Sequence, residues 1–117
     1  MPEQRGEWRY LCSELVEVDY ETAPGNFLKL DGNLEEIAPT GAILLLEVSV
    51  RRGNALTFRA QNRRLRGVVD SWLYEPPLGY FVTVRFEDGY EWREEHFRPA
   101  HTLKIPRATR ARSQEAS

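Results

Sequence analysis

The feature that most constrains this chain is a strict alternation of side-chain character in two short segments. Every second position from residue 44 to 50, and again from residue 80 to 86, carries an apolar residue: Leu44, Leu46, Val48 and Val50, then Tyr80, Val82, Val84 and Phe86. A helix would spread residues at this spacing around its circumference, whereas a strand turns them all to one face. Both segments are therefore predicted to be strands with one buried face.

Prolines and glycines divide the rest of the chain into pieces of similar length. Further strands are predicted within residues 10–20, 26–34, 55–60 and 65–74. Six or seven short strands at this spacing are typical of an antiparallel barrel or sandwich. The predicted fold class is therefore all-β.

Two local signals stand near the C-terminal end. Asp88-Gly89 lies between two β-like stretches and predicts a hairpin, because both central positions of such a turn favour positive φ. Residues 93–103 are the one stretch able to form a short helical turn, and Pro99 limits its length. We expect a small barrel or sandwich that ends in this helical turn.

The 117 residues are enough for one domain. Residues 1–4 are expected to be flexible, residues 5–105 to form the domain, and residues 106–117, which hold no large apolar side chain, to be a disordered basic tail. The longest apolar run covers residues 42–46, so no membrane span is expected. The N-terminus lacks the apolar core of a signal peptide, and a cytoplasmic location is the expectation.

Charge and cysteine content exclude further classes. The formal net charge is −2, which argues against a globally basic nucleic-acid-binding protein. Cys12 is the one cysteine, so neither a disulfide scaffold nor a cysteine-rich metal site is possible. His96 and His101 match no common zinc spacing, and no nucleophile elbow or phosphate-binding glycine loop occurs. We expect no enzyme, no metal and no cofactor.

The arginines are distributed unevenly. Residues 51–66 contain six arginines and no acidic residue. Such a patch can bind phosphates, which leaves open a small nucleic-acid-binding barrel. It can equally be a solvated edge whose charges discourage strand pairing.

Two motifs are candidates for a ligand site. Arg5 and Arg9 form an RxxxR pair just before the first predicted strand, and each guanidinium offers five donors in a planar fork. The second motif is EIAPTG, residues 36–41, which leads directly into an apolar strand. The same six residues also suit a tight turn between strands without any ligand.

These motifs and their order resemble the PilZ domain family. The segment LEEIAPTGAILLLE, residues 34–47, resembles the family motif written D/N-x-S-x-x-G. An RxxxR approach precedes it, and a basic turn, VVDSW and GYFVTVRF follow it in the family's order. YLCSELVEV at the start and EEHFRPAHTL at the end are also similar to a PilZ subgroup, so the resemblance spans about residues 5 to 103.

The resemblance implies a six-stranded antiparallel β-barrel that binds cyclic di-GMP, a bacterial second messenger. In the family, the RxxxR arginines stack on guanine and bind phosphates, and the motif turn supplies polar groups to the ligand. Carried onto this chain, the ligand-binding residues are Arg5, Arg9, Glu36, Ala38 and Gly41. No attached output domain is expected, so the signal would pass to a separate, unidentified protein partner.

Two positions depart from the family pattern. Glu36 replaces the Asp or Asn, and Ala38 replaces the Ser and has no hydroxyl. A lost hydrogen bond to a charged phosphate costs about 1.5–3 kcal/mol. Thr40 carries a hydroxyl two residues away. The alternative function is therefore a degenerate PilZ domain that no longer binds nucleotide and acts as a protein-interaction adaptor.

Overall fold

The computed structural model of this chain describes residues 8–106. Arg5, the expected flexible residues 1–4 and residues 107–117 of the expected tail lie outside the described residues. Pro106, the first residue of that expected tail, is described and ends the last strand.

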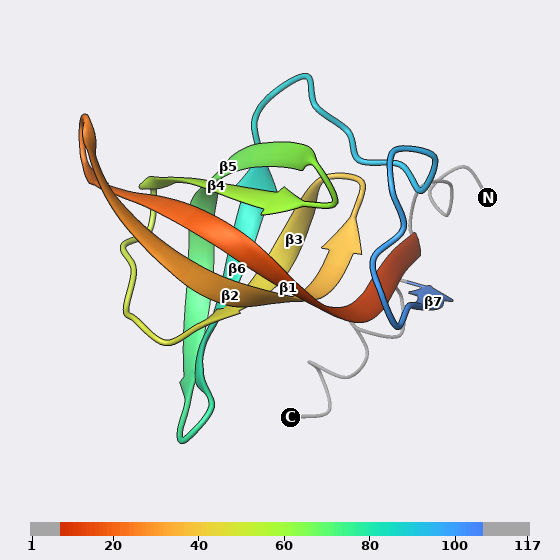
Figure 1. The fold of residues 1–117 in the computed structure, drawn as a ribbon, viewed down its shortest axis with the longest axis horizontal. Coiled ribbons are helices and arrows are strands. Elements are labelled where there is room, and N and C mark those ends of the chain that lie inside the picture. The colour runs from red at the N-terminus through yellow and green to blue at the C-terminus, as the bar shows by residue number, and fades with distance from the viewer. Residues whose placement is uncertain (1–7, 107–117) are drawn as a thin grey trace.

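The described chain consists of strands and connecting loops. Its strands are β1 (Trp8–Ala23), β2 (Asn26–Ala38), β3 (Gly41–Leu46), β4 (Ala55–Ala60), β5 (Arg63–Glu75), β6 (Gly79–Phe86) and β7 (Leu103–Pro106). All pairings are antiparallel and follow the order β2-β3-β6-β5-β4-β1-β7, and β1 also pairs with β2. Six strands thus close into a barrel, and β7 is added beside the N-terminal part of β1 (Figure 1). The predicted all-β fold and the closed six-stranded antiparallel barrel are confirmed.

The core lies inside the barrel and follows the period-two pattern of the strands. Inward-facing residues from all six barrel strands meet there, because a strand turns alternate side chains to opposite faces. The largest fully buried side chains are Trp92, Phe58, Leu34, Ile37, Leu44, Leu46, Leu56, Leu65, Val18, Val69, Val82 and Val84.

The strand predicted over residues 44–50 is shorter than its pattern suggests. β3 ends at Leu46, which pairs with Tyr80. Because β6 begins only one residue before Tyr80, the chain beyond Leu46 has no partner there and leaves the sheet. Val50 still reaches the core, but from the loop that leads to β4.

The hairpin predicted at Asp88-Gly89 is wrong, although the turn itself exists. The Glu87 carbonyl accepts a hydrogen bond from the Tyr90 N–H at 3.1 Å, and Gly89 has φ +87°. No strand follows the turn directly, since the next strand in the described chain is β7, which begins at Leu103. Instead the Trp92 N–H donates to the Pro39 carbonyl at 2.9 Å, and the Trp92 ring enters the core. The segment after the turn is therefore held by burial of the Trp92 side chain and not by backbone hydrogen bonds of a second strand.

The segment that follows crosses one end of the barrel before β7. Within it, the Arg93 carbonyl accepts a hydrogen bond from the His96 N–H at 2.9 Å, which closes a single turn. Phe97 packs against Trp92 with ring centroids 6.0 Å apart. Across residues 8–106 the structure has no helix that is long and apolar enough to cross a membrane.

Candidate functional site

The EIAPTG motif forms the tight corner between β2 and β3. Ala38 pairs with Gly41, and only Pro39 and Thr40 lie between the two strands. The carbonyl groups of these two turn residues accept hydrogen bonds from other parts of the chain. The Pro39 carbonyl accepts from Trp92, and the Thr40 carbonyl accepts from the Phe86 N–H at 2.9 Å. The corner is therefore tied to the end of β6 and to the segment that follows it.

A shallow hollow of about 170 Å³ opens beside this corner. The predicted residues Glu36, Ala38 and Gly41 all line it. Thr40 lines it as well, together with Ala38. The structure thus brings together three of the five predicted site residues.

Three further residues of the hollow were missed by the sequence reasoning. Asp70 on β5 and Thr83 and Arg85 on β6 complete its polar lining. The alternation of β6 could have predicted the orientation of two of them. If Val82 and Val84 face the core, Thr83 and Arg85 must face outward. Their closeness to the corner follows from the register, in which Gly41 pairs with Arg85.

Arg9 does not line the hollow but is built into the barrel wall behind Glu36. Its Nη1 donates to Glu36 Oε1 at 2.6 Å, and each side chain is only 9% exposed. The ion pair follows from the register of β1 and β2, because Tyr10 pairs with Ile37 and this brings the two strands together. Arg9 Nε is buried without a hydrogen-bond partner. The one RxxxR arginine that the structure describes is thus neutralised by the residue at the first motif position.

Gly41 has a packing role. A Cβ at this position would lie 2.3 Å from the Val84 carbonyl oxygen, far inside van der Waals contact. β3 and β6 can approach this closely only because residue 41 has no side chain. The glycine of the motif is therefore required by the barrel itself, whether or not a ligand binds.

A second concave region of about 260 Å³ lies on the other side of Pro39. Lys104 places its Nζ 4.8 Å from the ring centroid of Trp8, a cation–π contact. Beside it the Tyr10 hydroxyl donates to Glu94 Oε1. Burial first, and this hydrogen bond second, raise the pKa of Tyr10 to about 12. The contacts of Lys104 with Trp8 and of Tyr10 with Glu94 thus connect β7 and the segment after Trp92 to β1.

Three of the six arginines of residues 51–66 are engaged with acids or a carbonyl, and Arg51, Arg63 and Arg64 are exposed. Arg59 forms an ion pair with Glu17, and Arg66 Nε lies 2.5 Å from Glu87 Oε2. Arg52 Nε donates to a backbone carbonyl of β5 at 3.1 Å. These contacts favour the reading of the segment as a solvated, ion-paired edge.

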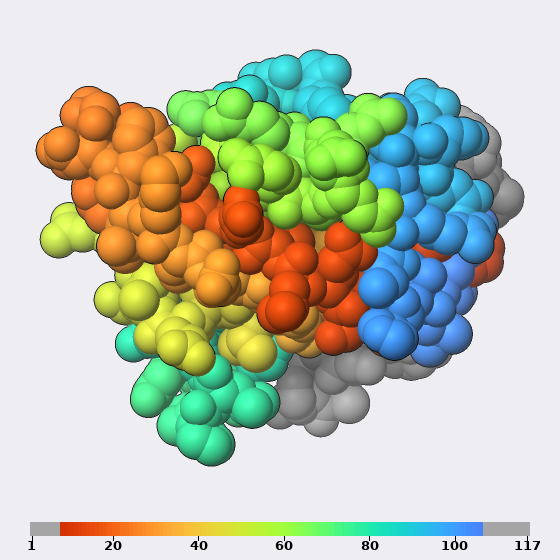
Figure 2. All heavy atoms as spheres, viewed as in Figure 1, coloured from red at the N-terminus to blue at the C-terminus, as the bar shows by residue number. Residues whose placement is uncertain are grey.

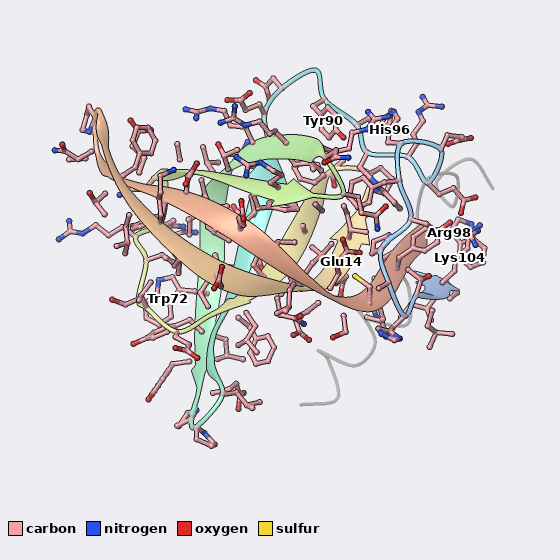
Figure 3. The ribbon with its side chains drawn as sticks, viewed as in Figure 1. Glu14, Trp72, Tyr90, His96, Arg98 and Lys104 are labelled. Carbon is pink, nitrogen blue, oxygen red and sulfur yellow. The ribbon has the colours of Figure 1, made fainter. Side chains whose placement is uncertain are left out.

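The two histidines lie outside the hollow beside the corner. His96 lies beside Tyr90 (Figure 3). The Tyr90 hydroxyl oxygen is 3.4 Å from His96 Nδ1. His101 is an exposed residue with φ +57° in the loop before β7. In the part of the chain that the structure describes, no group of three or more His, Cys, Asp or Glu residues could hold a metal ion.

No protein-family model matches this chain, and no curated protein matches it.

Proposed function

We propose that this protein is a bacterial, cytoplasmic signalling barrel of PilZ type that has lost nucleotide binding and acts as a protein-interaction adaptor. The observation that carries the proposal is the buried ion pair between Arg9 and Glu36. An arginine that binds cyclic di-GMP must offer its guanidinium to guanine and phosphate. Here that guanidinium is inside the barrel wall and already neutralised.

The cost of opening the pair is large. Withdrawing one partner from a buried ion pair leaves the other charge uncompensated and costs about 3–5 kcal/mol. About 3 kcal/mol of this alone would weaken nucleotide affinity roughly 150-fold. The missing hydroxyl of Ala38 adds to the loss, and the carboxylate of Asp70 in the same hollow repels a phosphate.

Support for protein contact comes from the opposite end of β6. The hairpin of β5 and β6 carries Trp72, Leu73, Tyr74 and Leu78, each 46–58% exposed. Large apolar side chains clustered on one projecting element are typical of protein interaction surfaces. An adaptor needs such a surface to bind its partner.

Calorimetric titration with cyclic di-GMP tests the loss of binding. We expect no saturable heat from the native chain at ligand concentrations up to about 1 mM, which corresponds to roughly 4 kcal/mol of binding free energy. The double variant Glu36→Asp with Ala38→Ser restores the family motif and releases Arg9, and we expect it to bind. The variant Thr83→Ala, in the same hollow, is the matched control and should stay silent. Saturable micromolar binding by the native chain would overturn the proposal.

The second candidate function is a cyclic di-GMP receptor that uses Arg5, Arg9, Glu36, Ala38 and Gly41. It is favoured by the convergence of Glu36, Ala38 and Gly41 on one hollow, where Thr40 supplies a hydroxyl and Arg85 a positive charge. In this case the native chain binds in the same titration. Arg9→Ala and Arg85→Ala should then each lose most of the affinity, while Arg64→Ala, on the outer face of β5, should not.

A further inference from the structure

The hairpin of β5 and β6 extends beyond the wall of the barrel and leaves one strand edge open. β5 pairs with β6 as far as Glu75, but with β4 only over residues 63–68. Among the described residues, Ser71–Glu75 therefore has a single neighbouring strand. Figure 1 shows the hairpin projecting from the barrel, and in Figure 2 it protrudes from the molecular surface.

The outward-facing backbone groups of this edge can be identified. The Glu75 carbonyl accepts a hydrogen bond from the Leu78 N–H at 2.7 Å, so the backbone groups of Glu75 face the inside of the hairpin. Backbone groups of successive residues point to alternate sides of an antiparallel strand. The N–H and carbonyl groups of Trp72 and Tyr74 therefore point away from β6, toward the open side.

The side chains on this edge offer little protection against pairing. Trp72 and Tyr74 share one face of the hairpin, where both pack on Tyr80 with ring centroids 5.6 and 4.7 Å away. Leu73 occupies the other face and is 58% exposed. Natural edge strands are usually blocked by lysine, proline or a bulge. Neither lysine nor proline occurs from residue 71 to 75, and the register shift of β5 lies at the start of this stretch, between Val69 and Ser71.

We infer that a second copy of this chain pairs with this edge, β5 to β5 and antiparallel, about a two-fold axis at Leu73. In this register Trp72 of one copy lies opposite Tyr74 of the other, and the outward groups of both residues are satisfied. The aromatic pair lies on one face and the two Leu73 side chains meet on the other. The inference rests on the proposed function only in assigning protein contact to this hairpin.

Charge complementarity selects a second copy as the occupant. Arg52 lies at the start of the open edge, where its Nε donates to the Asp70 carbonyl at 3.1 Å. Glu75 lies at the other end of the edge. The two-fold register places Glu75 of one copy opposite Ser71 of its partner, next to the arginine that is bonded to residue 70. Each dimer thus gains two Arg52–Glu75 pairs.

The other projecting hairpin provides the matched control. β2 pairs with β3 only from Asn33 onward, so residues 26–32 also have a single neighbour in the described chain. Phe27 is 54% exposed there. This edge, however, carries Lys29, whose Nζ lies 3.0 Å from Asp19, and Asp31. Charges of this kind protect an edge from pairing.

Sedimentation equilibrium over a concentration series tests the inference. The native chain should change from monomer to dimer mass as its concentration rises. Arg52→Glu and Glu75→Arg should each raise the dimer dissociation constant by about tenfold, because each places like charges together. The double variant should return to within about threefold of the native value. Loss of the intrachain Arg52 contact alone would not be repaired in this way.

A second pair of variants tests the position of the axis. Leu73→Lys places two charges face to face and should abolish the dimer, whereas Phe27→Lys should leave it unchanged. A native chain that is monomeric at all concentrations overturns the inference, as does a dimer that responds equally to both lysine variants. Neither result bears on nucleotide binding, which the calorimetric titration decides separately.

Discussion

Glu36 determines whether the Arg9 guanidinium is available to a ligand. The longer carboxylate side chain reaches back into the barrel wall and meets the guanidinium at 2.6 Å. An aspartate would end one bond, about 1.5 Å, earlier. Glu36, where the sequence differs from the motif that it resembles, therefore also forms the ion pair that keeps the Arg9 side chain buried. Effects of this kind are invisible when each motif position is judged separately.

Tyr10 and Cys12 carry a testable pH dependence. Burial, and for Tyr10 also the hydrogen bond to Glu94, raises the pKa of both groups to about 12, from 10.0 and 9.0. Because the folded values are the higher ones, this stability is complete below the unfolded pKa values and is lost as the pH rises toward 12. Urea unfolding at increasing pH should show the loss. Tyr10→Phe should remove roughly 2–3 kcal/mol of it, while Tyr74→Phe, at an exposed ring, should not change the profile.

At the scale of elements, the β2–β3 corner shows how a binding motif and a folding motif coincide. The turn carbonyls bond to Phe86 and Trp92, and the absence of a side chain at Gly41 allows β3 to reach β6. The corner also forms the wall of the hollow. Its residues therefore stabilise the barrel, and a mutation there changes both the stability of the fold and the shape of the hollow.

Gly41→Ala separates these roles. The added Cβ would overlap the Val84 carbonyl, and since a backbone oxygen cannot move aside cheaply, we expect a loss of about 1–3 kcal/mol in the free energy of unfolding. Thr83→Ala, on the open side of the same hollow, should cost less than about 1 kcal/mol. Urea titration followed by tryptophan fluorescence measures both. Equal stability of Gly41→Ala and the native protein would contradict the close approach of the two strands.

At the scale of the whole molecule, barrel closure distributes the charges. Pairing β1 with β4 places Glu17 beside Arg59, and the turn after β6 places Glu87 beside Arg66. A segment that is purely basic in the sequence thus becomes part of a mixed surface. Arg51, Arg63 and Arg64 of the same segment are exposed to solvent.

Nucleic-acid binding is accordingly expected to be absent. Fluorescence anisotropy with labelled single-stranded DNA and RNA at low salt should show no saturable binding, since few phosphates could be neutralised at once. A variant that removes the paired acids, Glu17→Gln with Glu87→Gln, should bind more tightly than the native chain. Strong, salt-sensitive binding by the native chain would instead support the nucleic-acid-binding barrel.

Much of the fold could be predicted from the sequence, and less of the candidate site. The alternation at Leu44, Leu46, Val82 and Val84 identifies strands and their inner faces, and all four side chains are buried as expected. The motif residues could be chosen by their order along the chain. Asp70, Thr83 and Arg85 could not, because their place beside the corner depends on the pairing of β3, β6 and β5.

What the sequence by itself determined is therefore local: strand period, turn positions and the all-β class follow from neighbours along the chain. The tertiary structure alone decided that Arg9 meets a carboxylate 27 residues away and that Trp92 enters the core after a turn that resembled a hairpin. It also decided that residues 71–75 keep an open edge. The physical reason is that register and closure arise from contacts between distant segments, and these set which polar groups remain available to a ligand or a partner.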